Sequence, residues 1–249
     1  MVEENFPPLS VRSRAIILGS LLGDGSLAVN QHYVNARFSF RHSIKQKEYF
    51  LWKARELAEI ASEKHTWEQG TNSIGSDGWG GKKLRFQSKA LPQLTEIFRL
   101  IHKGGKKTIR RKWLNMLTPL SLAVWWMDDG SLVGDTKQGV FSTDSFSLEE
   151  VKILDRYMKK VWHITTKIGR TKEGYFRLGI RSTEELKKFM RIVLPHIPVE
   201  EMLYKVLLLY RDSELQQRWI SEVVEKTSFS QEIVERQIEK KKEKWKYFR

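Results

Sequence analysis

The spacing of apolar and polar residues alternates between two periods along this chain. In residues 37–41 aromatic and polar side chains alternate strictly, which is typical of a strand with one buried face. In residues 45–61 apolar positions recur at the spacing of a helix that packs on one side. The pattern therefore predicts a protein built from helices and antiparallel strand pairs.

The first half of the chain is predicted to follow the order helix, strand pair, helix, strand pair, helix. A glycine-rich stretch over 73–81 predicts a mobile loop. The expected ranges are a helix from Ser10 to the Asp24-Gly25 turn, a strand pair within 26–43, a helix over 45–61, strands over 65–72 and 82–88, and a helix over 91–102.

The second half is predicted to repeat this order, and Ser147 and Glu150 have the spacing of a capping box. The expected ranges are a helix over 119–129, a strand over 139–144, a helix over 147–162, a hairpin of 164–170 and 175–181, and a helix over 183–194.

These elements predict three regions. We expect a first repeat over residues 1–116, a second over 117–210, and a basic helical extension over 211–249. Lysines at 240–246 could contact phosphate, although such a run is more often a solvated helix face.

Two apolar stretches, residues 16–27 and 120–132, contain the same ending, Asp-Gly-Ser-Leu. Glycine just after a helix is ordinary, because it caps the helix without steric cost. Aspartate in the last turn is not ordinary, because the helix dipole is already negative there. Two ordinary Asp-Gly turns are one interpretation. The matched pair, Asp24 and Asp129, favours a divalent metal ion between two helix ends.

Composition narrows the class of partner. The chain has 249 residues, no cysteine and a formal net charge of +14. This charge favours nucleic acid first and an anionic membrane second, although a merely basic protein would also carry it. The lack of cysteine excludes disulfides and thiolate metal sites.

Targeting signals are not evident. The apolar runs are too short to span a bilayer, and residues 1–8 are acidic and interrupted by prolines, unlike a signal or transit peptide. We therefore expect a soluble, intracellular protein that is not secreted and has no membrane partner.

The sequence does not predict a zinc site or a nucleotide-binding phosphate loop. The six histidines lack ligand spacing, so no zinc site is predicted, and no glycine-rich phosphate loop joins a strand to a helix. Trp125 and Trp126 are expected in the core rather than stacked on bases.

The two motifs resemble those of LAGLIDADG homing endonucleases, with Gly23-Asp24-Gly25 and Asp128-Asp129-Gly130 in the place of the terminal Ala-Asp-Gly. The first motif departs from the usual spelling at Ser20 and Leu22, but the last aspartate is kept in both. The sequence is most similar to the single-chain, two-motif branch typified by the yeast mitochondrial omega-intron endonuclease. Across roughly residues 10–210 the resemblance extends through Lys106-Lys107-Thr108-Ile109, Leu117-Thr118-Pro119-Leu120-Ser121-Leu122-Ala123 and Tyr204-Lys205.

The resemblance implies an α+β fold of two pseudo-symmetric αββαββα repeats. The motif helices would pack side by side at the centre, where small residues such as Gly19 and Ala123 permit close approach. Two antiparallel β-sheets would form a DNA-binding saddle, and the protein would act as a monomer with internal pseudo-two-fold symmetry.

The resemblance also implies a metal site. Asp24 and Asp129 would be catalytic and would hold Mg²⁺ (or Mn²⁺), with the backbone carbonyls of Gly23 and Asp128 joining the metal shell. The Asp128 side chain is expected to be structural rather than a ligand.

Lys107 and Lys205 match the family's two active-site lysines. They lie 98 residues apart, close to the 105 residues that separate the aspartates, which favours a symmetric pair over two surface lysines. Recognition of the DNA base sequence is assigned to the polar faces of the two sheets, because β-ribbons fit the major groove of DNA. The candidate DNA-binding residues are Arg37, Ser39, Arg41, Lys83, Arg85, Gln87, Lys167, Arg170, Arg177 and Arg181.

The expected function is a site-specific endonuclease that hydrolyses both strands of double-stranded DNA at a long, asymmetric target. The alternative is a catalytically silent binder on the same scaffold, either an intron RNA maturase or a DNA-binding regulator. Both aspartates and both lysines are present, which favours the enzyme. The lack of protein-splicing signals favours a free-standing enzyme over an intein, and intron RNA stays open as a further partner.

Overall fold

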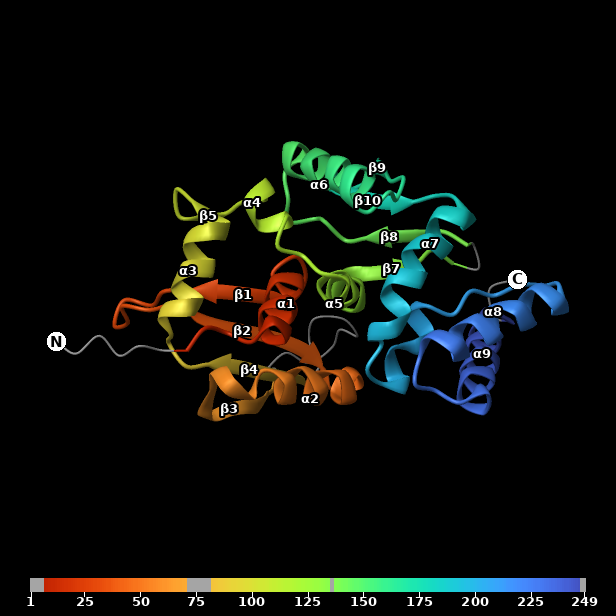
Figure 1. The fold of residues 1–249 in the computed structure, drawn as a ribbon, viewed down its shortest axis with the longest axis horizontal. Coiled ribbons are helices and arrows are strands. Elements are labelled where there is room, and N and C mark those ends of the chain that lie inside the picture. The colour runs from red at the N-terminus through yellow and green to blue at the C-terminus, as the bar shows by residue number, and fades with distance from the viewer. Residues whose placement is uncertain (1–6, 71–81, 135–136, 247–249) are drawn as a thin grey trace.

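The computed structural model describes residues 7–70, 82–134 and 137–246, so the loop expected over 73–81 lies outside the described residues. The first half contains the helix of the first motif, two strand pairs and two further helices (Figure 1). Its elements are α1 (Val11–Ser20), β1 (Gly25–Ala28), β2 (Arg37–Ser43), α2 (Lys47–Glu56), β3 (Ala61–Gln69), β4 (Lys83–Ser88) and α3 (Pro92–Ile101).

The second half repeats this order after a short connection. The connection contains β5 (His102–Lys103), β6 (Lys106–Lys107) and α4 (Arg111–Leu114). The second half comprises α5 (Pro119–Asp129), β7 (Gly130–Leu132), β8 (Gly139–Phe141), α6 (Leu148–Val161), β9 (Lys167–Arg170), β10 (Phe176–Ile180) and α7 (Thr183–Val193).

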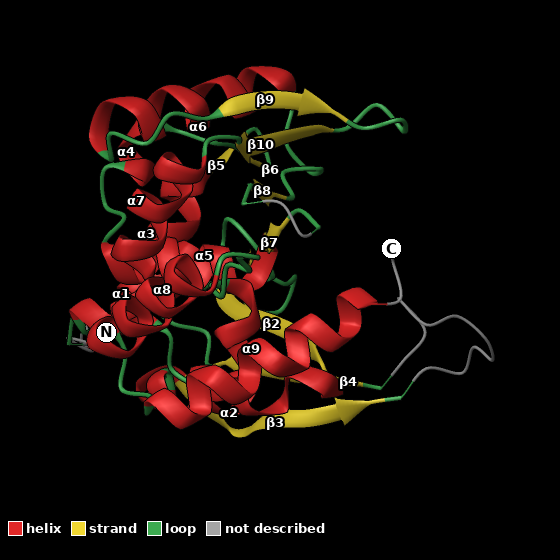
Figure 2. Ribbon diagram, turned by 90° about the vertical axis from the view of Figure 1, so that its right-hand side faces the viewer, coloured by secondary structure: helices red, strands yellow, loops and turns green. Residues whose placement is uncertain are grey.

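Two four-stranded antiparallel sheets carry the internal symmetry. The strand orders are β1-β2-β4-β3 and β7-β8-β10-β9, so each strand has its counterpart in the other sheet. The registers also correspond, because Gly25 lies opposite Phe40 and Gly130 lies opposite Phe141. Figure 2 shows the strands of both sheets projecting to the same side, away from α1 and α3. The predicted α+β fold with two repeats and antiparallel sheets is confirmed.

The motif helices α1 and α5 pack against each other at the centre of the molecule (Figure 1). A Cβ atom at Gly19 would lie 2.3 Å from the Ser121 carbonyl oxygen, so only glycine permits this approach. The Ser121 hydroxyl donates to the Ala15 carbonyl at 2.9 Å and links the helices further. The close contact thus pairs Gly19 with the backbone of Ser121.

Apolar sheet faces and the motif helix build the core. Trp125 and Trp126 are fully buried, and Trp125 stacks on Phe141 with 4.0 Å between ring centroids. In the other sheet Phe40 stacks on Phe86 at 5.0 Å. The core position expected for the two tryptophans is confirmed.

Capping boxes fix the starts of two of the described helices. Ser147 and Glu150 form the predicted capping box of α6. Thr118 and Ser121 form a second one at the start of α5. A cap satisfies backbone N–H groups that a helix start leaves free, so it fixes where the helix begins.

Some element boundaries differ from the sequence prediction. The helix expected over 45–61 ends at Glu56, because the chain passes through a short 3₁₀ turn and then pairs Ala61 with Ser88. The strand expected over 139–144 spans only Gly139–Phe141. The short β5, β6, β7 and α4 have no counterpart in the prediction, because two to four residues show no clear period.

The C-terminal extension contains α8 (Ser213–Lys226) and α9 (Gln231–Lys246). Arg191 of α7 pairs with Glu222 of α8. Arg236 of α9 pairs at 2.9 Å with Glu200 in the 3₁₀ segment η4 (Glu200–Lys205). Among the helices that the structure describes, none combines the length and apolar character needed to cross a membrane.

Candidate active site

The two motif aspartates stand at the ends of the packed central helices. Asp24 follows α1 directly before β1, and Asp129 is the last residue of α5 directly before β7. A Cβ atom at Gly130 would lie 2.1 Å from the Trp126 ring, so glycine is required where the chain leaves α5 for the sheet. The fold therefore brings the two carboxylates to one place.

The aspartates differ in electrostatic environment. Burial and the charges of Asp24 and Asp128 together raise the pKa of Asp129 to about 7, although two nearby lysines lower it in part. Burial also raises the pKa of Asp24, but the contact with His42 and the charges of His42 and Lys53 outweigh it and hold that pKa below its usual value. Asp129 thus has no direct contact with a described residue that offsets its burial in the way that His42 does for Asp24.

The two predicted lysines occupy equivalent positions in the two halves. Lys107 Nζ donates to the Leu21 carbonyl at 3.0 Å. Lys205 Nζ donates to the Met127 carbonyl at 2.5 Å and, at a longer 3.5 Å, to the Trp126 carbonyl. Leu21 and Trp126 each lie three positions before the motif aspartate of their half. Burial lowers the pKa of both lysines, while the charge of Asp129 raises both in part. The structure therefore places one lysine beside each helix end.

Asp128 lies in a buried ion pair that the sequence analysis did not foresee. Lys53 Nζ contacts the two Asp128 carboxylate oxygens at 2.7 and 3.0 Å, and both side chains are fully buried. The Tyr49 hydroxyl donates to Asp128 Oδ1 at 2.8 Å. A Cβ atom at Gly23 would lie 2.5 Å from Asp128 Cβ, so the glycine makes room for this side chain.

The sequence contains a signal for the buried ion pair of Lys53 and Asp128. Lys53 falls on the apolar face of α2 with Tyr49, Phe50 and Ala54, and a lysine at core spacing needs a buried partner. The structural role expected for the Asp128 side chain stays a prediction.

His42 received no role in the sequence analysis. Its Nδ1 lies 3.3 Å from Asp24 Oδ2, and its Nε2 lies 3.9 Å from Asp128 Oδ1. The ring is buried, and neither nitrogen meets hydrogen-bond geometry with any described residue. One ligand atom each from Asp24, His42 and Asp128 lies within 4.8 Å of the others, so this group could hold a metal ion. The alternation through Phe38 and Phe40 is the signal that places His42 inside.

The donor set fits a hard divalent cation. Asp24 and Asp129 offer carboxylate oxygens, which Mg²⁺ and Mn²⁺ prefer. Within the described residues Asp129 has no ion pair or hydrogen bond to its carboxylate, so that group has free lone pairs. The Asp128 carboxylate is already neutralised by Lys53, whereas its carbonyl, which accepts from Lys205 at 3.3 Å, faces the site.

The candidate DNA-reading residues of the first half lie on adjacent strands. Ser39 is opposite Gln87 and Arg41 is opposite Arg85 across β2 and β4. They alternate with buried residues, so they share the face turned away from the helices. The remaining two, Arg37 and Lys83, continue the same alternation.

The candidate DNA-binding residues of the second half differ from one another in exposure and in their partners. Arg177 forms a bidentate pair with Asp144 at 2.7 and 2.8 Å, so an acidic partner already neutralises it. Arg181, just beyond β10, donates to the Gln138 side chain at 3.2 Å. Lys167 and Arg170 lie at opposite ends of β9 and are exposed.

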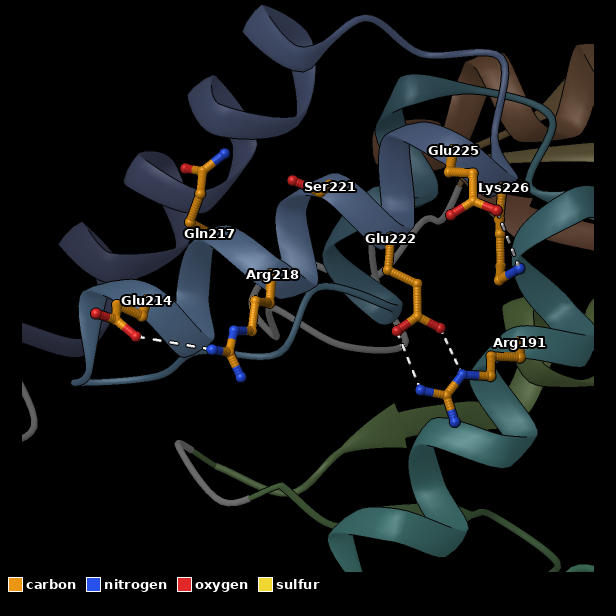
Figure 3. A pocket seen from close by; sticks show the side chains of 8 residues that line it. All are labelled: Arg191, Glu214, Gln217, Arg218, Ser221, Glu222, Glu225 and Lys226. Carbon is orange, nitrogen blue, oxygen red and sulfur yellow. Dashed lines mark hydrogen bonds and ion pairs between the residues drawn. The ribbon is translucent and has the colours of Figure 1, made fainter.

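A separate hollow of about 720 Å³ lies between α7 and α8 (Figure 3). Its charged side chains pair with one another, as Arg191 with Glu222 and Arg218 with Glu214 (Figure 3). Neither motif aspartate lines this hollow. Its charges are satisfied internally, so it offers no competing active site.

The molecule has two repeated halves whose packed central helices lead to an aspartate, Asp24 after α1 and Asp129 at the end of α5. The chain belongs to the LAGLIDADG DNA endonuclease family, whose model matches residues 14–189. The structure resembles that of the homing endonuclease I-WcaI bound to its DNA recognition sequence, with a TM-score of 0.71 and 24% sequence identity. That likeness covers 84% of this chain and 91% of the other and supports the fold.

Curated relatives also match. Protein RecA of Mycolicibacterium fallax is 32% identical over 216 residues, which are 82% of this chain and 48% of the relative. The cytochrome b mRNA maturase bI2 of Saccharomyces cerevisiae is 27% identical over 213 residues, which are 82% of this chain and 49% of the relative. The chain thus spans about half the length of these relatives.

Proposed function

We propose that the protein is a site-specific endonuclease that hydrolyses both strands of a long, asymmetric double-stranded DNA target. The observation that carries this proposal is the symmetric arrangement of the two helix ends, where Lys107 donates to the Leu21 carbonyl ahead of Asp24 and Lys205 donates to the Trp126 carbonyl ahead of Asp129. Two such centres would let the protein act on one strand at each. The family match supports nuclease chemistry in general.

The chain's own residues have distinct tasks in this reaction. Asp24 and Asp129 would hold Mg²⁺ or Mn²⁺ with help from the carbonyls of Gly23 and Asp128. A divalent ion bound there supplies a Lewis acid for the phosphate and lowers the pKa of water. Lys107 and Lys205, held by main-chain carbonyls, would orient water or offset charge on the phosphate.

Target recognition is assigned to the two sheets. The polar face of β2 and β4 places Arg41, Arg85 and Gln87 side by side, with spacing suited to the major groove. The two halves differ in sequence, so a single chain would read an asymmetric site as a monomer. We assign the half-sites to residues 1–116 and 117–210, with 211–249 as an extension.

Cleavage of a genomic DNA library tests this function. The protein is incubated with the library in Mg²⁺ or in EDTA, and the new ends are sequenced. The expected result is Mg²⁺-dependent breaks in both strands at one long site. Selective binding without breaks would overturn the nuclease assignment.

An intron RNA maturase is the second candidate. The similarity to a yeast cytochrome b mRNA maturase favours this candidate over a purely DNA-binding regulator. Incubation of the protein with a self-splicing intron RNA under low Mg²⁺ distinguishes the two. Faster splicing in the presence of the protein would assign the maturase activity, alone or beside cleavage.

A further inference from the structure

A second hollow, of about 980 Å³, borders the active-site residue Lys205. It lies between β7, η4 and α9, and it includes Lys45 from the first half. Ser131, two residues after Asp129, also lines it. The hollow therefore connects the second catalytic centre with a helix that the family match at 14–189 does not reach.

α9 is anchored on the segment that carries Lys205. Lys241 Nζ donates to the Tyr204 carbonyl at 2.8 Å and to the Leu207 carbonyl at 2.6 Å. Arg236 and Gln237 both contact the Glu200 carboxylate. These bonds fix the helix relative to the active site, so Lys240 and Lys244 project from a fixed part of the helix.

The lysines on this face of α9 differ from those elsewhere on the helix. Lys240 and Lys244 are exposed, line the hollow and form no ion pair with a described residue; Lys45 across the hollow shares these properties. Lys242, by contrast, pairs with Glu239 at 2.7 Å and does not line the hollow.

The charge around the hollow is positive. Among the described residues, five lysines line it against two glutamates, Glu201 and Glu243, although burial lowers the pKa of one of them, Lys241, to about 7. Glu201 also accepts the Tyr49 backbone N–H at 3.3 Å. Exposed, unpaired lysines around a concave surface suit a chain of phosphates, because lysine binds phosphate as a point charge.

We propose that this hollow binds the sugar–phosphate backbone of DNA beside the Asp129–Lys205 centre through Lys45, Lys240 and Lys244. α9 is then a third DNA contact, separate from the two sheets and present in only one half. In Figure 2 α9 extends toward the side on which the strands of both sheets project. The inference rests on the proposed action on DNA.

Salt-dependent binding to a 30-base-pair mixed-sequence duplex tests the proposal. Fluorescence anisotropy gives Kd between about 50 and 200 mM salt for the wild type, K240A/K244A, K45A and the matched control K242A. Each lost phosphate contact lowers the slope of log K against log salt by about 0.9. The expected loss is about 1.8 for K240A/K244A, about 0.9 for K45A and none for K242A.

The outcomes separate the two proposals. If the wild type binds the duplex and K240A/K244A keeps its slope, the third contact is overturned. An equal loss in K242A would show an effect of total charge and would also overturn it. If the wild type does not bind duplex DNA, the proposed function itself fails. Lys45, Lys240 and Lys244 are exposed and Lys242 is half-exposed, and unchanged thermal unfolding checks that each variant is folded.

Discussion

Lys53 of α2 and Asp128 of α5 form an ion pair between the two halves, with 2.7 Å between Nζ and Oδ1 and both side chains fully buried. Residue 23, which precedes the motif aspartate of the first half, is glycine, whereas residue 128, at the equivalent place in the second half, carries this carboxylate. The pair therefore makes the central interface asymmetric. It also holds α2 against the end of α5.

Removal of only one partner should destabilise the fold. K53M leaves the Asp128 charge buried without compensation, and we expect a loss of about 3–5 kcal/mol in the free energy of unfolding. K53M/D128A removes both charges and should recover most of that loss. Urea unfolding measures both variants. Equal stability of K53M and the wild type would show that the pair contributes nothing.

Loss of either motif carboxylate should abolish cleavage and spare DNA binding. A metal at the scissile phosphate contributes several kcal/mol, so D24N should lower the cleavage rate by about 100-fold or more. The sheets that bind DNA are unaffected, so Kd for duplex should change little. Single-turnover cleavage and anisotropy measure the two quantities. Cleavage by D24N at the wild-type rate would remove Asp24 from the metal site.

The metal-free protein should contain one aspartate that titrates near neutral pH. Burial and two neighbouring carboxylates raise the pKa of Asp129 to about 7. Below pH 7 this carboxyl is protonated and must lose the proton before it binds metal, so Mn²⁺ affinity should fall as the pH decreases from 7 to 5.

Carboxyl carbon NMR of the metal-free protein measures this titration directly. The resonance with a midpoint near 7 should disappear in D129N and shift to lower pH in D24N, because the Asp24 charge contributes to the raised pKa of Asp129. A midpoint near 4 for every aspartate would contradict the electrostatic environment inferred for Asp129.

Gly19, where the two motif helices touch, should tolerate no side chain. In G19A the new methyl group would meet the Ser121 carbonyl, which is backbone and cannot rotate away. We expect a loss of about 1–3 kcal/mol, as in other overpacked cores. G70A is the matched control, because a Cβ at Gly70 meets nothing within 4 Å. Thermal unfolding of both variants tests this, and a wild-type melting temperature for G19A would disprove it.

The sequence by itself determined the order of elements and the identity of the central helices. Alternation around Phe38 and Phe40 and the helical spacing near Phe50 depend on local periodicity, which survives without tertiary information. The repeated Asp-Gly ending identified Asp24 and Asp129. The resemblance to the LAGLIDADG endonucleases indicated Lys107 and Lys205, and their symmetric separation supported them as a pair.

Only the tertiary structure decided which side chains meet at the site. Lys53, Tyr49 and His42 reach Asp24 and Asp128 from α2 and β2, and no local pattern specifies a contact between residues more than 70 positions apart, such as Lys53 and Asp128. The different pKa shifts of Asp24 and Asp129 likewise depend on burial and on charges contributed by distant segments. Periodicity records which face of an element is buried, whereas packing alone decides what that face touches.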